Sequence, residues 1–243
     1  MSRMKLFCAA WLLPFFLLTG CQAKETEKSP IRVSILGDSI STYQGYTPYP
    51  DNYQYPKAAY PDFTSVEQTW WYQLIYQKME NAVLEVNSSY TGTCVQETTE
   101  KGHPGLGFLH RYVELGDPDV ILVNGGTNDA WSFSLPVGKL DFEKATGDLD
   151  VHQFAQAYDK LIRLLQEKYP SAKIGCIIGD CVTDPYLNRY AQVIRDVCAH
   201  YELPCAEVVF LDRAASTYDN VHPNPAGMAD MATQIYYLLR NIL

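Results

Sequence analysis

Residues 31–39 read Ile-Arg-Val-Ser-Ile-Leu-Gly-Asp-Ser, a short run rich in β-branched residues that ends in a turn. Runs of this kind suit strands that are buried on both faces of a parallel sheet. Four more follow along the chain, at 82–86, 120–123, 174–178 and 206–211. We therefore expect five strands, the first of which places Ser39 at its carboxyl end.

Amphipathic stretches separate these runs. They predict helices over 67–80, 106–115, 151–168 and 185–200, and a last helix that begins near Asn224-Pro225. Asparagine followed by proline is a favourable helix start, because the asparagine can cap and the proline fits the first turn. The alternation predicts an α/β fold, with an open, doubly wound sheet of five parallel strands in one domain.

Polar residues and a glycine follow the ends of these predicted strands. Ser39 follows the first strand, Gly92 the second, Asn128 the third, and Asp219 and His222 the fifth. Sites in such sheets lie outside the carboxyl ends of the strands. We therefore expect these five residues to meet at one edge of the sheet.

Ser39 and His222 fit the nucleophile and the base of a hydrolase. A serine hydroxyl is a weak nucleophile and needs an adjacent base that a third group orients. Asp219 lies three residues before His222 and can both orient the imidazole and stabilise its protonated form. Taken singly, Ser39 also fits a helix cap and His222 an ordinary surface histidine. As a set, they make hydrolysis of an acyl ester the leading hypothesis.

Gly92 and Asn128 are candidates for stabilising the charge that develops on a reacting carbonyl oxygen. A glycine lets a backbone N–H approach a substrate, and the Asn128 amide can donate to the same oxygen. Such a donor is worth about 3 kcal/mol of barrier. Both residues also fit plain turns, Gly92 as one that needs a positive φ.

The sequence resembles the SGNH hydrolases, also called GDSL esterases, in four ordered blocks: Gly37-Asp38-Ser39-Ile40, Gly92, Gly126-Thr127-Asn128-Asp129 and Asp219-x-x-His222. The resemblance implies a flavodoxin-like fold, a three-layer α/β/α sandwich, and a serine esterase mechanism. It implies Ser39 as nucleophile and His222 as base, oriented by Asp219. It also implies an oxyanion hole made by the backbone N–H groups of Ser39 and Gly92 with the Asn128 side chain, and no metal or organic cofactor.

The N-terminal residues resemble a bacterial lipoprotein signal. Arg3 and Lys5 precede an apolar run over 6–18, which is shorter than the roughly 20 residues of a membrane span. The run closes with Leu18-Thr19-Gly20-Cys21, which is similar to a lipobox and implies acylation of Cys21. We expect a signal peptide over 1–20, a polar tether over 21–30 and an SGNH hydrolase domain over 31–243. The protein would then be exported and lipid-anchored to the cell envelope, on its periplasmic or its outer face.

Net charge and cysteine content indicate which binding partners, disulfides and metal sites to expect. The chain carries a formal net charge of −9, which argues against nucleic acid and against a polybasic membrane patch. Membrane attachment is expected through the lipid on Cys21. The domain contains Cys94, Cys176, Cys181, Cys198 and Cys205. A disulfide between Cys198 and Cys205 is one possibility and buried free thiols are the other. No Cys-x-x-Cys or His-x-x-x-His spacing indicates a metal site.

Two long loops are expected over the site, because they follow the first and third strands. Residues 43–63 contain six tyrosines, and residues 131–150 begin with Trp131. Aromatic faces with polar rims suit sugar rings, although the same side chains can simply pack the loops. Together with export, the loops favour the removal of acetyl groups from a polysaccharide, so that the partner is an acylated glycan or small molecule. The alternatives are a lipase or thioesterase for longer acyl chains and a non-catalytic glycan-binding lipoprotein.

Overall fold

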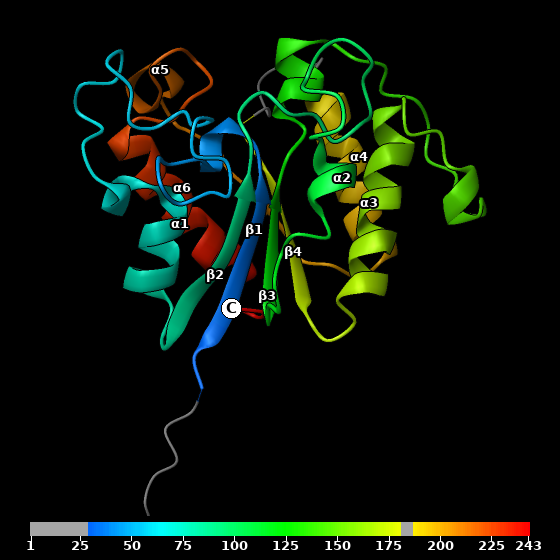
Figure 1. Ribbon diagram of the computed structural model, residues 1–243, viewed down its shortest axis with the longest axis horizontal. Helices are drawn as coiled ribbons and strands as arrows, with labels where there is room; N and C mark the ends of the chain where they lie inside the picture. The colour runs from blue at the N-terminus through cyan, green and yellow to red at the C-terminus, as the bar shows by residue number, and fades with distance from the viewer. Residues whose placement is uncertain (1–28, 181–186) are drawn as a thin grey trace, which may run out of the picture.

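The computed structural model describes residues 29–180 and 187–243, and a parallel sheet lies at its centre. The strands are β1 (Ile31–Gly37), β2 (Ala82–Ser89), β3 (Val120–Asn124), β4 (Lys173–Ile178) and β5 (Cys205–Glu207). They lie in the order β2-β1-β3-β4-β5, and every neighbouring pair is parallel. All carboxyl ends therefore meet at one edge, the upper edge in Figure 1. The predicted five-stranded α/β sheet is confirmed.

Helices cover both faces of this sheet and complete the three-layer sandwich (Figure 1). One face carries α2 (Phe108–Arg111), α3 (Phe154–Lys168) and α4 (Leu187–His200). The other carries α1 (Trp70–Tyr72), η3 (Gln73–Lys78) and α6 (Pro225–Leu239). Each face has its own apolar core, and this double burial explains why the strands read as short apolar runs.

The helix predicted over 67–80 is divided into three pieces. It consists of the 3-10 turn η2 (Val66–Gln68), the single α-turn α1 and the π-helix η3. Trp70 and Trp71 are fully buried, and their indole N–H groups donate to Ser41 Oγ at 3.3 Å and Ser41 O at 3.0 Å. The apolar pattern identified the buried side chains correctly, but a 3.6-residue period does not distinguish a π-turn from an α-turn.

Other boundaries differ in length. The helix predicted over 106–115 is only the four-residue α2. The last helix begins at Pro225 as predicted, with the Asn224 side chain accepting from Gly227 N at 3.0 Å, and it ends at Leu239. Strand β5 ends at Glu207 instead of residue 211, because the chain leaves the sheet there and Leu211 is fully exposed.

Several predictions fall on residues outside the described ranges. These are the signal peptide, most of the tether with Cys21, and the first two residues of the helix expected over 185–200. Cys181 also lies there, whereas Cys94, Cys176, Cys198 and Cys205 are free thiols, so the Cys198–Cys205 disulfide is not formed. Within residues 29–180 and 187–243, no helix is long and apolar enough to cross a bilayer.

Candidate active site

Ser39 lies where β1 ends. Gly37, the last residue of β1, packs closely against Ser89 of β2, and a Cβ at Gly37 would lie only 2.6 Å from Ser89 Oγ. A residue with a side chain would not fit there. Asp38 caps the 3-10 turn η1 (Ser39–Ser41) and accepts a hydrogen bond from Ile40 N at 3.1 Å. As a result, Ser39 begins a short helical turn at the carboxyl edge of the sheet, with 5% of its surface exposed.

Ser39, His222 and Asp219 form a hydrogen-bonded line. Ser39 Oγ lies 3.0 Å from His222 Nε2, and His222 Nδ1 lies 2.7 Å from Asp219 Oδ2. Asp219 Oδ1 accepts from the backbone N–H groups of Val221 at 3.1 Å and His222 at 2.8 Å. Burial by itself would raise the pKa of Asp219, but the hydrogen bonds from His222 hold that pKa below its usual value. A carboxylate so placed can orient the imidazole and stabilise its protonated form.

The loop after β5 brings these residues together from distant strands. β3 and β4 separate β1 from β5 in the sheet, so the chain must return across the carboxyl edge to reach Ser39. Along that path it forms α5 (Arg213–Ser216), and then a tight loop closed by Tyr218 N donating to His222 O at 2.9 Å. Tyr55 OH donates to Pro223 O at 3.0 Å and ties this loop to the tyrosine-rich segment.

Tyr60 makes a contact with the line that the sequence did not indicate. Its hydroxyl donates to Asp219 Oδ2 at 3.2 Å and accepts from Gln54 Nε2 at 2.8 Å. Lys57 Nζ in turn donates to Gln54 Oε1 at 2.6 Å. Burial and the Asp219 charge raise the pKa of Tyr60 to about 12, so it stays a donor at neutral pH. The ring stacks on Tyr218 with centroids 4.1 Å apart.

Gly92 and Asn128 lie on the β2 and β3 side of Ser39. Gly92 has a φ of +81°, so the turn reading of this glycine is correct, and His103 Nε2 would lie 3.1 Å from a Cβ there. Asn128 begins η4 (Asn128–Ser132), and its amide donates to Thr93 O at 2.9 Å. An amide nitrogen carries two N–H groups, so one of them remains for a substrate.

Buried ionisable side chains form hydrogen bonds with the turns that carry Gly92 and Asn128. Asp129 accepts from Val95 N and Gln96 N, each at 3.0 Å, and burial raises its pKa to about 6. Burial, with a contribution from the charge of Asp129, raises the pKa of Asp38 to about 7. Arg111 is buried as well, and its guanidinium donates to Gly37 O at 3.0 Å, to Ser88 O and to Thr93 Oγ1. These bonds link the end of β1 to the loop that carries Gly92.

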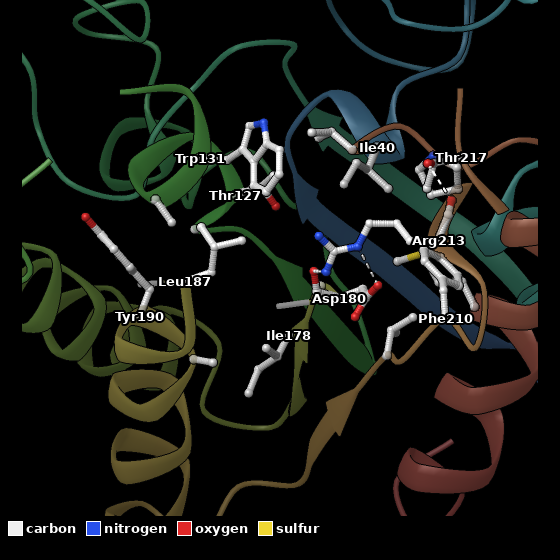
Figure 2. A pocket seen from close by; sticks show the side chains of 18 of the residues that line it. Ile40, Thr127, Trp131, Ile178, Asp180, Leu187, Tyr190, Phe210, Arg213 and Thr217 are labelled. Carbon is white, nitrogen blue, oxygen red and sulfur yellow. Dashed lines mark hydrogen bonds and ion pairs between the residues drawn. The ribbon is translucent and has the colours of Figure 1, made fainter. Parts of the chain in front are cut away.

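A mostly apolar cavity of about 70 Å³ opens at the ends of β3, β4 and β5 (Figure 2). Ile40 and Val221 line it, and these residues are neighbours of Ser39 and His222 in the sequence. Leu187, Ile194 and Phe210 form much of the remaining wall. Pockets of this kind, apolar with a few polar groups, are the usual form of a small-molecule site.

The aromatic residues of the two long loops divide into packed and exposed ones. Tyr55 and Tyr60 are buried in the core over α1 and α6, so the packing interpretation holds for them. Trp131 is 42% exposed and lines the cavity, and Tyr46 is similarly exposed. Of the aromatic side chains in these loops, Trp131 is therefore the one at the cavity wall.

All five predicted residues thus lie at the same edge of the sheet, and three of them are in direct contact. The sequence did not indicate Tyr60, Arg111 or the cavity, because each depends on contacts between distant segments. Among the residues that the structure describes, no three His, Cys, Asp or Glu side chains are grouped to hold a metal ion.

Comparisons with known proteins identify the family of this chain. The sequence matches the GDSL-like lipase/acylhydrolase family over residues 31–239, and no curated protein matches the chain. A GDSL-like lipase from Bacteroides ovatus is 30% identical with a TM-score of 0.75, over 88% of this chain and 100% of that chain. A GDSL-like lipase from Bacteroides uniformis is 32% identical with a TM-score of 0.74, over 87% of this chain and 96% of that chain.

A family two carbohydrate esterase from Clostridium thermocellum, in complex with cellohexaose, shares the fold. It is 19% identical with a TM-score of 0.59, over 88% of this chain and 65% of that chain. The family match spans nearly all of the domain that begins at β1, and the two Bacteroides lipases cover most of the chain. This chain therefore belongs to the GDSL-like lipase/acylhydrolase family of the SGNH hydrolases and is a serine hydrolase that cleaves ester bonds.

Proposed function

We propose that Ser39, His222 and Asp219 are the catalytic residues, and that the ester cleaved is an acetyl ester on a carbohydrate. The hydrogen-bonded line from Ser39 Oγ to Asp219 is the observation that supports the catalytic assignment most directly. His222 accepts the Ser39 proton as Oγ attacks the ester carbonyl, and a tetrahedral intermediate forms. The alcohol leaves with the proton from His222, and water then hydrolyses the acyl-enzyme in the same way.

The oxyanion of each intermediate needs donors that are already in place. The backbone N–H groups of Ser39 and Gly92 and the second amide N–H of Asn128 are the proposed donors. Asn128 is fixed by two hydrogen bonds, one to Thr93 O and one from Ser132 Oγ at 3.0 Å, so its amide need not reorganise during the reaction. Preorganised donors of this type lower the barrier by about 3 kcal/mol each.

Two observations favour a carbohydrate as the alcohol. Trp131 exposes its ring at the cavity wall, three residues after Asn128 in the chain. Aromatic faces that are partly exposed beside polar groups suit sugar rings. The fold is also that of the Clostridium thermocellum esterase whose structure holds cellohexaose.

The apolar cavity favours a second candidate, an ester or thioester with a longer acyl chain. Its wall is aliphatic over much of its area, and burial of each CH₂ group gains about 0.8 kcal/mol. Acetyl on a carbohydrate remains the first choice because of the exposed Trp131 ring and the shared fold of the esterase that holds cellohexaose.

We also propose that the domain is exported and held at the cell envelope by a lipid on Cys21. The support is the sequence Leu18-Thr19-Gly20-Cys21 after a short apolar run. A lipid anchor of this kind needs no basic membrane patch, in keeping with the net charge of −9.

The test is hydrolysis of p-nitrophenyl esters from C2 to C12 by the wild type, Ser39→Ala and a control, Ser65→Ala, whose serine only caps η2. We expect kcat for acetate to fall about 10⁴-fold or more in Ser39→Ala, and to stay unchanged in the control. Full activity in Ser39→Ala would refute the nucleophile assignment. A preference for C8 to C12 esters would replace the acetyl proposal with the longer-chain candidate.

A further inference from the structure

Two charged side chains line the apolar cavity at the ends of β3, β4 and β5. Asp180 and Arg213 both line it, with side chains that are only 7% and 20% exposed. Arg213 Nε donates to Asp180 Oδ2 at 2.9 Å, and Arg213 Nη2 donates to Asp180 O at 2.8 Å. Thr217 Oγ1 donates to Arg213 O at 2.7 Å and helps to fix the turn that carries the arginine. The guanidinium is therefore held in one position.

This guanidinium still has donors to offer. A guanidinium carries five N–H groups, and the two bonds to Asp180 use one on Nε and one on Nη2. Among the described residues, Arg213 Nη1 makes no hydrogen bond. Figure 2 shows the guanidinium extending between Trp131 and Asp180 into the cavity. Within the described ranges, the buried atom of this pair without a hydrogen-bond partner is Asp180 Oδ1. A ligand hydroxyl that accepts from Arg213 Nη1 and donates to Asp180 Oδ1 therefore fits this position.

The charges of Arg213 and Asp180 indicate whether the ligand's acceptor group is neutral or anionic. Asp180 already compensates the positive charge of Arg213, so the pair offers donors without a net charge. An anionic ligand would meet the Asp180 carboxylate as well as the guanidinium, and this repulsion disfavours it. A neutral hydroxyl or ring oxygen accepts the same hydrogen bond without that penalty.

Trp131 supplies the second feature of the ligand. Its ring lies 5.9 Å from the guanidinium carbon of Arg213 and is 42% exposed. An exposed indole face beside fixed hydrogen-bond donors suits a ring with apolar faces and polar edges. Ile40 and Val221 line the same cavity, and they directly follow Ser39 and precede His222 in the chain.

We infer that Arg213, Asp180 and Trp131 form the subsite for a neutral sugar ring that carries the ester. The Arg213 Nη1 group donates to a hydroxyl or ring oxygen, Asp180 holds the guanidinium and cancels its charge, and Trp131 packs on the ring face. This inference rests on the proposed function, because it assigns the leaving alcohol of the same reaction. It also specifies that this alcohol is uncharged.

The first test compares an acetylated xylo-oligosaccharide with p-nitrophenyl acetate in the wild type, Arg213→Met and Arg213→Lys. We expect the ratio of kcat/KM for the sugar ester to that for p-nitrophenyl acetate to fall about tenfold or more in both variants. Arg213→Lys keeps a cation beside Asp180 but loses Nη1, so it separates the hydrogen bond from the charge. The matched control is Arg32→Met, which removes an arginine bonded to Asp117 and Asp119 at the opposite end of β1, and it should leave the ratio unchanged.

A second variant tests the charge argument. Asp180→Asn leaves the guanidinium charge uncompensated, so we expect the activity on an acetylated oligogalacturonide, relative to that on the xylo-oligosaccharide, to rise. An unchanged ratio, or a wild type that already prefers the galacturonide, would overturn the assignment of a neutral ring.

Binding provides a readout that does not depend on the reaction. In Ser39→Ala, unesterified xylobiose should change the fluorescence of Trp131, since Trp70 and Trp71 are fully buried. Adding Arg213→Met or Trp131→Phe should abolish the change.

The possible outcomes separate this inference from the proposed function. If the wild type cleaves no sugar ester but xylobiose binding still depends on Arg213, the subsite is supported and the carbohydrate esterase proposal fails. If sugar ester hydrolysis is intact in Arg213→Met while the p-nitrophenyl chain-length preference shifts, the cavity holds the acyl group and the inference is overturned.

Discussion

At the scale of single residues, Tyr60 extends the catalytic line beyond Asp219. Its hydroxyl shares Asp219 Oδ2 with His222 Nδ1, and Gln54 and Lys57 hold it from behind. Tyr60 touches no reacting atom in this arrangement, so we regard it as a positioning residue. It fixes one carboxylate oxygen and withdraws part of the negative charge that faces the imidazole.

Tyr60→Phe tests this role. We expect kcat/KM to fall about fivefold, since one partly exposed hydrogen bond to a charged group is worth on the order of 1 kcal/mol. Without the donor, the carboxylate oxygen that faces His222 Nδ1 is held less firmly. We therefore expect kcat to fall while KM stays unchanged. Tyr218→Phe is the control, because its hydroxyl bonds Asp62 instead of Asp219. A kcat for Tyr60→Phe equal to that of the wild type would exclude a role in positioning the carboxylate.

At the scale of elements, the junction between β1 and η1 contains a carboxyl group in an unusual state. Asp38 is fully buried and accepts from Ile40 N, and its second oxygen has no hydrogen-bond partner within the part of the chain that the structure describes. Burial raises its pKa to about 7, well above the 3.8 of an exposed aspartate. The folded state therefore holds this proton more tightly than the unfolded state does. Its contribution to stability is complete below pH 3.8 and is lost as the pH rises through about 7.

Asp38→Asn removes this titration while keeping an oxygen for Ile40 N. Between pH 5 and pH 8 we expect the wild type to lose about 2–3 kcal/mol of unfolding free energy relative to the variant. The buried amide adds a constant cost of about 1–3 kcal/mol at every pH. Urea denaturation at several pH values measures the difference, with the exposed Asp51→Asn as control. Parallel stability curves for Asp38→Asn and the wild type would show that Asp38 is ionised throughout.

The elements also show how far local sequence can predict structure. The five strands and their parallel arrangement could be predicted from short apolar runs, as at Val120–Asn124, where every residue is buried. β5 ends early because the chain must return to Ser39. Nothing in the sequence of residues 206–211 indicates this, because the run is apolar throughout most of its length. Similarly, Tyr55 and Tyr60 read as possible ligand contacts, and only the packing against α1 and α6 shows that they are core residues.

At the scale of the whole molecule, the parallel sheet explains why the catalytic residues could be predicted together. Ser39 and His222 are 183 residues apart, yet both follow strands whose carboxyl ends share one edge. The cavity could not be predicted in this way. Its wall joins side chains from η1, β4, α4 and the loop after β5, and none of these contacts follows from a motif. The Arg213–Asp180 pair is of the same kind, since its partners are 33 positions apart, one after β4 and the other at the start of α5.

The same sheet sets the direction in which an anchored domain would face. The chain enters β1 at Ile31, at the lower edge in Figure 1, and the site lies at the opposite edge. A seven-residue strand spans about 23 Å, so the site lies about that far from the point where the chain enters the sheet. If Cys21 carries the proposed lipid, we expect polymeric substrate to reach the site without meeting the membrane.

Cys21→Ala follows from this geometry. We expect the variant to move from the membrane fraction to the soluble fraction of the cell envelope, because a net charge of −9 offers little attraction to an anionic surface. Its kcat/KM should equal that of the wild type on both p-nitrophenyl acetate and acetylated polysaccharide, since the site lies at the end of β1 opposite to the one where the chain enters the sheet. A variant that stays in the membrane fraction would contradict the lipid anchor. Faster hydrolysis of polymer, but not of p-nitrophenyl acetate, would instead show that the anchored site faces the bilayer.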